Sequence, residues 1–169
     1  MRSPLTPFFC ILCTILIGSA MAGRSVAQED PGRAKVGVLE VTVYYATNGD
    51  PSAAGERAQK ISDDTRERME KVEHLEFSHY RALGAESQAI FRTYENWAQP
   101  LKPSDEILVR FEPRSQPTAD AVRLDLELWL SRKKILKTDV SLKESDPLYV
   151  LGPQWRGGRL IIAVALARK

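Results

Sequence analysis

The sequence predicts an α+β domain, in which a mostly antiparallel sheet of roughly six to eight strands packs against one long amphipathic helix. Three observations lead to this prediction. Several stretches alternate between apolar and polar residues, as β-strands with one buried face do. Turn-forming Gly, Pro and Asn residues separate these stretches. One further stretch repeats its apolar residues every three or four positions. A β-sandwich with an inserted helix is the alternative.

The N-terminal residues 1–27 have the pattern of a secretory signal peptide. Arg2 provides a short basic region, and an apolar run follows over residues 8–17. Small residues in Ala20-Met21-Ala22 and in Ser25-Val26-Ala27 provide two cleavage sites, and the sequence does not choose between them. An uncleaved anchor is the competing interpretation, but the apolar run is short for a membrane span.

Cleavage would leave residues 28–34 as a flexible leader and residues 35–169 as a single globular domain. We therefore expect an exported protein, in the periplasm or outside the cell. Cys10 and Cys13 are the only cysteines, and both lie in the predicted signal. The mature chain would then have neither a disulfide nor a thiolate metal site. No second apolar stretch is long enough to span a membrane.

The charge balance restricts the class of partner. The whole chain has a formal net charge of +2, from 24 Lys and Arg against 22 Asp and Glu. Arg2 and Arg24 belong to the predicted signal, and without these two the mature chain has 22 basic and 22 acidic residues. A nucleic-acid-binding domain would show a basic excess. We therefore expect no nucleic-acid partner.

The mature domain begins with a predicted strand over residues 35–46, which is apolar on both faces, as expected for a central strand. Asp50 and Pro51 then favour the start of a helix. Apolar residues at helical spacing predict one amphipathic helix from Ser52 to about Leu75, lying on the sheet. A right-handed crossover through this helix would make the first two strands parallel.

Further strands are predicted from apolar runs between turn signals. They cover residues 77–83, 87–97, 106–111, 148–151 and 159–167. The last of these has a second face of small and apolar residues, including Ile161, Ala163 and Ala165. We expect the predicted helix to pack against that face.

The clearest pattern is a β-hairpin over residues 122–142, in which apolar and polar residues alternate on both strands. Pairing Leu130 with Leu136 places the apolar side chains of both strands on one face, whereas a shift by one residue would mix the faces. This pairing sets Glu127 opposite Asp139 on the solvent face. The turn lacks Asn-Gly or Asp-Gly, so we expect a loop of roughly three to five residues.

Catalytic and metal-binding motifs are not evident in the sequence. His74 and His79 are the only histidines, and their predicted positions do not fix a shared metal geometry. There is no G-x-S-x-G motif and no phosphate-binding loop. The carboxylates of the hairpin, Asp125, Glu127 and Asp139, could form a pair for glycoside cleavage. Alternating charges are also ordinary on a solvated sheet face, and we expect no catalytic residue, no metal and no cofactor.

The most distinctive loop covers residues 152–158 and combines glycines with a Trp and an Arg. Such a pair could stack on a ring or bind an anion. Alternatively, the Trp simply covers the end of the sheet. A second Trp is predicted to face outward on the hairpin. The candidate ligand or partner surface consists of Trp129, Trp155, Arg156, Gly157 and Gly158.

Three segments carry a resemblance: His79–Gly84, the Leu-rich hairpin, and Leu151–Val164 with its Gly-Pro-Gln-Trp-Arg-Gly-Gly loop. Together they resemble small secreted bacterial proteins of unknown function. The resemblance implies an exported bacterial domain and no functional residues.

These observations favour an exported cell-envelope binding or protein-interaction module without catalytic activity. Its expected partner is another envelope protein or a glycan. The alternative is a carboxylate-dependent hydrolase that acts on an envelope glycan. A third hypothesis is a subunit of a larger envelope complex.

Overall fold

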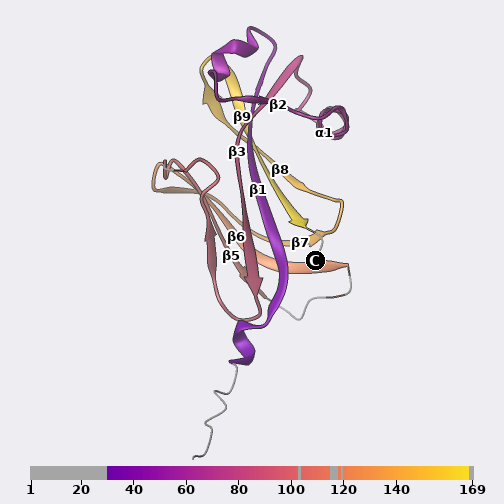
Figure 1. Cartoon of the computed structure of the whole chain (residues 1–169), viewed down its shortest axis with the longest axis vertical. Coiled ribbons are helices and arrows are strands. Elements are labelled where there is room, and N and C mark those ends of the chain that lie inside the picture. Colours follow the sequence, from indigo (N-terminus) through magenta and orange to yellow (C-terminus); the bar gives the residue numbers. More distant parts are fainter. Residues whose placement is uncertain (1–29, 103, 115–117, 119, 168–169) are drawn as a thin grey trace, which may run out of the picture.

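The computed structural model describes residues 30–102, 104–114, 118 and 120–167. The predicted signal peptide lies outside this range. Two antiparallel sheets pack face to face, and the five-stranded sheet extends beyond the four-stranded sheet at one end (Figure 1). No helix in the described part of the chain has the length and apolar character needed to cross a membrane.

The larger sheet has the strand order β2-β3-β1-β9-β8. Its strands are β1 (Lys35–Thr47), β2 (Gln59–Lys60), β3 (His79–Phe91), β8 (Leu148–Trp155) and β9 (Gly158–Ala167). The smaller sheet has the order β4-β5-β6-β7, with β4 (Asn96–Ala98), β5 (Ile107–Pro113), β6 (Ala121–Leu130) and β7 (Lys133–Lys143). The helical elements are the 3₁₀ turns η1 (Pro31–Arg33) and η2 (Pro51–Ala54) and the helix α1 (Asp63–Glu70).

One apolar core lies between the two sheets. Val41 and Val43 of β1 contribute to it from the larger sheet, and Phe111 and Leu126 contribute from the smaller one. All four residues are buried, with exposed fractions of 0% to 1%. Successive side chains of a strand point to opposite faces. One face of each strand therefore packs in this core, and the other face points out of the sandwich.

The prediction of one long amphipathic helix over residues 52–75 is wrong. This segment contains η2, the two-residue strand β2 and the eight-residue helix α1. Gly55, with φ of 93°, ends η2 in a conformation that no helix contains. Ser62 then caps a new helix, because its side chain accepts a hydrogen bond from the Thr65 amide at 3.2 Å. Met69 is the only residue of α1 that is buried.

The α+β class is therefore also wrong, since the protein consists mainly of two antiparallel sheets. The arrangement is nearer to the alternative, a β-sandwich with an inserted helix. The inserted segment, however, contains only the eight-residue helix α1. The first two long strands, β1 and β3, are antiparallel rather than parallel. The strands expected over residues 77–83 and 87–97 are replaced by one continuous β3 and the short β4.

The chain between β2 and β3 covers one end of the outer face of the larger sheet. Met69 and Leu75 pack there against Ile161 of β9 and Tyr80 of β3 in a second apolar cluster. The Tyr80 hydroxyl donates a hydrogen bond of 2.5 Å to the Leu75 carbonyl and holds the turn after α1 on the sheet. The Ile161 face of β9 thus receives the helical segment, but through a single short helix.

The hairpin of β6 and β7 has the predicted inward and outward faces, but its register differs by two residues. Leu128 pairs with Leu136, Glu127 with Lys137, and Asp125 with Asp139, with a register shift between Leu128 and Trp129. The expected longer loop is replaced by a two-residue turn over residues 131 and 132. Both turn residues have positive φ, 46° for Ser131 and 65° for Arg132, as a type I′ turn requires. The sequence does not reveal this turn, because neither residue is the usual Gly or Asn.

The double variant Ser131→Asn with Arg132→Gly is expected to raise the free energy of unfolding by about 1 kcal/mol, because Asn and Gly accept positive φ more readily. Urea unfolding followed by circular dichroism measures the change. Ser141→Gly, in the extended part of β7, is the matched control and should destabilise the protein. A longer loop would make the double variant neutral or destabilising.

Candidate functional site

The turn between β8 and β9 forms the end of the larger sheet. Trp155 pairs with Gly158, and the two central residues have positive φ, 46° for Arg156 and 77° for Gly157. Gly158 has no room for a side chain, because a Cβ atom there would lie 2.4 Å from the Ala46 carbonyl oxygen. The turn therefore lies directly against the end of β1.

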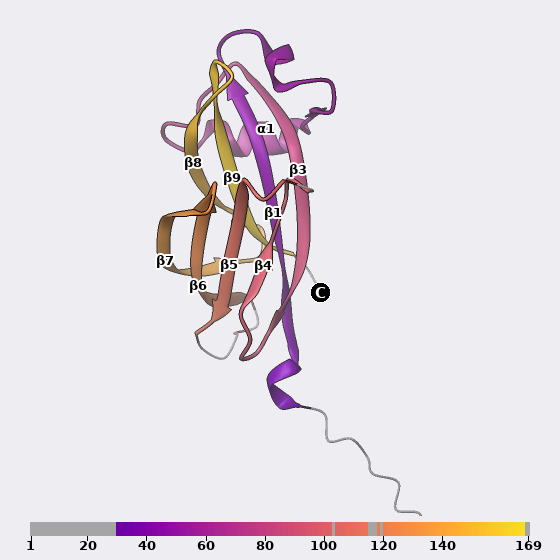
Figure 2. The ribbon, with the colours of Figure 1, turned by 90° about the vertical axis from the view of Figure 1, so that its left-hand side faces the viewer.

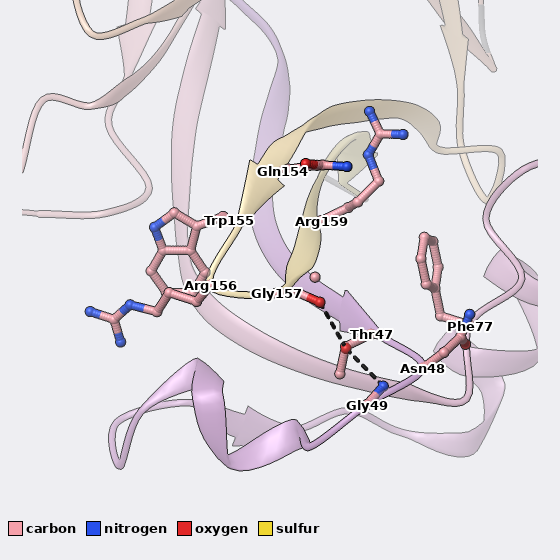
Figure 3. A pocket seen from close by; sticks show the side chains of 10 residues that line it. Thr47, Asn48, Gly49, Phe77, Gln154, Trp155, Arg156, Gly157 and Arg159 are labelled. Atoms are coloured by element: carbon pink, nitrogen blue, oxygen red, sulfur yellow. Dashed lines mark hydrogen bonds between the residues drawn. The ribbon is translucent and has the colours of Figure 1, made fainter.

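Side chains of β1 hold this turn by its carbonyl groups. The Tyr45 hydroxyl donates to the Arg156 carbonyl at 3.0 Å, and the Thr47 hydroxyl donates to the Gly157 carbonyl at 3.5 Å. The Thr47 oxygen also accepts a hydrogen bond from the Gly49 amide at 3.0 Å (Figure 3). The β8–β9 turn and the turn after β1 are thus connected through one side chain.

A cavity of about 510 Å³ lies between these two turns. Its lining contains two arginines and no carboxylate. The lining residues are Thr47, Asn48, Gly49, Phe77, Gln154, Trp155, Arg156, Gly157, Gly158 and Arg159. The charge of the lining is therefore positive, in a protein whose predicted mature chain is formally neutral.

Arg159 is the central cation of this cavity. It is half-buried, and its Nε atom is buried without a hydrogen-bond partner. No carboxylate of the described residues lies within ion-pairing distance of its guanidinium. Most buried arginines in proteins are paired, because a buried donor without an acceptor costs about 1–3 kcal/mol. Arg159 is thus a donor group for which the described part of the chain supplies no acceptor.

Two amide side chains also line the cavity, with Gln154 next to Arg159 and Asn48 at the other end beside Phe77 (Figure 3). The oxygen of Asn48 accepts hydrogen bonds from the Ser78 amide at 2.8 Å and the Ser78 hydroxyl at 3.2 Å. These bonds orient the Asn48 side chain and leave its NH₂ group available to donate. The side chain of Gln154 is exposed, and Gln154 pairs with Arg159 across the hairpin. The cavity therefore has a guanidinium and one amide at one end and a second amide at the other.

The structure divides the sequence-predicted surface residues between two places. Trp155, Arg156, Gly157 and Gly158 border the cavity, whereas Trp129 lies on β6 of the other sheet. Figure 3 shows the side chains of Trp155 and Arg156 on the opposite side of the hairpin from Arg159.

The Trp155 ring packs edge-on against Tyr45, with ring centroids 5.6 Å apart, and contacts the main core. Arg156 stacks over the Trp155 ring at 4.4 Å. Trp155 thus covers the end of the core, which was the simpler interpretation of this loop.

The candidate surface predicted from the sequence did not include four of the lining residues: Asn48, Phe77, Gln154 and Arg159. One signal was present. Arg159 begins an otherwise apolar strand, and a charged residue beside buried residues is usually paired with an acidic group or a ligand. The other residues come from separate turns, and no local pattern connects them.

The second predicted set, the hairpin carboxylates, has a different environment from the one expected. Asp125 and Glu127 point away from the core, yet they are only 4% and 5% exposed. Arg114 and Lys137 contact the Asp125 carboxylate. Glu127 accepts hydrogen bonds from Lys134 at 2.9 Å and from the Trp129 indole at 3.1 Å. The long side chains of the neighbouring residues therefore cover this face, so the expectation of a solvated face is wrong for these two carboxylates.

These contacts keep the carboxylates ionised. Burial acts to raise the pKa of Asp125, but the hydrogen bond from Arg114 and the charge of Lys137 lower it below its usual range. The hydrogen bond from Lys134 lowers the pKa of Glu127, and Arg123 does the same for Asp139. A glycosidase needs one carboxylic acid with a raised pKa as proton donor. The pKa shifts of all three groups have the opposite direction.

The two histidines do not come together in a metal site. His74 is exposed and has positive φ, and its Nε2 atom lies 3.3 Å from the Glu73 carboxylate. His79 begins β3. No group of three or more His, Cys, Asp or Glu residues in the described ranges is placed to hold a metal ion.

No protein-family model, curated protein or solved structure matches this chain. The functional argument therefore depends on the geometry and charges of the chain itself.

The variant Arg159→Met is expected to raise the free energy of unfolding by about 1 kcal/mol, because it removes a buried donor that has no partner and keeps most of the apolar volume. Chemical unfolding of the ligand-free protein measures this change. Arg110→Met is the matched control and should destabilise the protein, because Arg110 is paired with Glu95 and Glu112. Destabilisation by Arg159→Met would show that Arg159 has a structural partner.

Stability is expected to fall as the pH decreases below about 4, where carboxylates of the unfolded chain become protonated. A carboxylate with a lowered pKa in the folded state stabilises the fold above its unfolded pKa, and this contribution is lost as the pH falls through the folded pKa. Asp125, Glu127 and Asp139 all have this sign.

Urea midpoints measured between pH 7 and pH 2 test this expectation. The variant Asp125→Asn should flatten the acid limb of the curve relative to the parent protein. An unchanged acid limb would contradict the assignment of the ion pairs.

Proposed function

We propose that this protein is an exported binding module whose ligand carries a carboxylate or phosphate group, and that Arg159 binds this group in the cavity beside the β8–β9 turn. The export part of the proposal is supported by the signal-peptide pattern of residues 1–27. The binding part rests on one observation, which is that Arg159 has a buried Nε atom with no acceptor in a cavity lined by no carboxylate.

An anion in this cavity would accept N–H bonds from the terminal nitrogens of the Arg159 guanidinium, because the Nε atom is itself buried. A carboxylate or phosphate group accepts two parallel N–H bonds from a guanidinium, one at each of two oxygens, and such charge-assisted bonds are roughly twice as strong as neutral ones. Gln154, which pairs with Arg159 across the hairpin, would supply a further N–H donor beside it. Phe77 adds an aromatic surface to the lining, which suits the carbon skeleton of an organic anion.

The lining favours binding over catalysis. It contains no Ser, Cys, His, Asp or Glu, which are the usual nucleophiles and general bases. Its one hydroxyl, that of Thr47, is already bonded to the Gly157 carbonyl and the Gly49 amide. The groups that remain available are the positively charged guanidinium of Arg159 and the neutral amides of Asn48 and Gln154. They can hold an anion but cannot take up a proton.

Citrate and inorganic phosphate serve as probes for this site, measured against sodium chloride at equal ionic strength. NMR of arginine Nε–H groups follows Arg159 directly, and its resonance is assigned by its loss in Arg159→Gln. We expect citrate to shift this resonance and to raise the melting temperature. Arg159→Gln should weaken citrate binding at least tenfold.

Arg132→Gln is the matched control, since Arg132 is an exposed arginine in the turn of the other sheet's hairpin. It should leave citrate binding within twofold of the parent. Equal weakening by the two substitutions would show non-specific attraction between charges and would overturn the proposal, as would the absence of any shift at Arg159.

A further inference from the structure

The outer face of the four-stranded sheet carries a second group of exposed aromatic residues, apart from the cavity at Arg159. Trp97 of β4 is 40% exposed, and Trp129 of β6 is half-buried beside it. Their ring centroids are 5.9 Å apart and their planes are inclined by 52°. Trp97 pairs with Arg110 on β5, and Trp129 pairs with Leu108 on the same strand. The two indoles therefore meet across β5, on the sheet of β4 to β7 that lies toward the viewer in Figure 2.

The charged groups around these indoles neutralise one another. Five basic and five acidic side chains are joined in ion pairs on or beside this face, so these paired groups together carry no net charge. They are Arg110, Arg114, Arg123, Lys134 and Lys137 with Glu95, Glu112, Asp125, Glu127 and Asp139. Nothing in this charge pattern favours an anionic or a cationic partner.

Trp129 is held in place before any ligand arrives, and Trp97 packs against its ring. The Trp129 Nε1–H group donates to Glu127 at 3.1 Å, and the Lys134 ammonium lies 5.2 Å from the centre of the Trp129 ring. Arg110 beneath Trp97 is bonded to both Glu95 and Glu112. A rigid aromatic surface loses little conformational entropy when it binds a ligand.

We propose that this face binds a neutral oligosaccharide, which stacks a sugar ring on the exposed indole of Trp97, beside Trp129. The C–H groups of a pyranose ring carry a slight positive charge and match the negative face of an indole ring. The sugar hydroxyls can replace water around the ion pairs because they both donate and accept hydrogen bonds. The ion pairs that border the indoles would remain solvated by those hydroxyls.

A protein partner or a second copy of the chain fits this face less well. Stable protein interfaces bury about 800 Å² on each side and exclude charged residues from their centre. Here charged side chains surround the two indoles, and burying these ion pairs under an apolar surface would cost the hydration of each charge. In the described part of β4 to β7, the large apolar residues that are exposed are Trp97 and Ile135.

Maltohexaose and cellohexaose are suitable probes, titrated into the mature chain while NMR follows the indole N–H resonances. We expect one or both sugars to shift the resonances of Trp97 and Trp129 and not that of Trp155, with an affinity that does not change between low and high salt. Trp97→Ala should weaken binding at least tenfold, and Trp97→Phe, which keeps an aromatic ring, should restore part of it.

Tyr94→Ala is the matched control, because Tyr94 is an aromatic residue with a similar exposed fraction of 44%, and it should leave the affinity within twofold. Arg159→Gln should also leave sugar binding unchanged, which separates this site from the anion site. The proposal is overturned if neither sugar shifts the indole resonances, or if Tyr94→Ala weakens binding as much as Trp97→Ala. A dimer in sedimentation that Trp97→Ala dissociates would also overturn it, in favour of a second copy.

Discussion

The packing of two sheets around one apolar core is the constraint on which the rest of this structure depends. Each strand of a sandwich gives alternate side chains to the core, as β1 does with Val41 and Val43 and β5 does with Phe111. The remaining side chains form two outer faces, and each face must be compatible with water. On the larger sheet, α1 and the turn after it cover part of the outer face with apolar contacts. On the smaller sheet, a network of ion pairs covers it.

The difference between the two outer faces explains why the two proposed sites differ in chemistry. On the larger sheet, the covering segment brings Phe77 beside the end of β9, where Arg159 has no acidic neighbour. Arg159 therefore has no ion-pair partner among the described residues, and its charge favours an anionic ligand. On the smaller sheet the charged groups that border the aromatic pair, Arg110, Glu127 and Lys134, are joined in ion pairs. The exposed indole ring of Trp97 is therefore the most distinctive feature of that surface.

The same architecture limits the exposure of strand edges, which are sites of unwanted pairing between proteins. The edge strands β2 and β4 have only two and three residues. The edge strand β8 contains Pro153 within a register shift between Leu151 and Gln154. The long edge strand β7 has lysines along its length, including Lys133 and Lys143. These four edge strands are thus short, irregular or charged, whereas β3 extends well beyond the two residues that pair with β2.

The sequence by itself determined where most strands lie and which side chains of each strand point inward, because alternation with period two is a local property. It could not determine the register of β6 and β7, since a shift of two residues leaves the inward and outward faces unchanged. The helix was predicted too long because the helical spacing was given more weight than two local signals, Gly55 and the cap at Ser62. Only the tertiary structure decided that Arg159, Asn48 and Phe77 share a cavity and that Trp97 reaches Trp129, because these contacts join strands and turns that are distant along the chain.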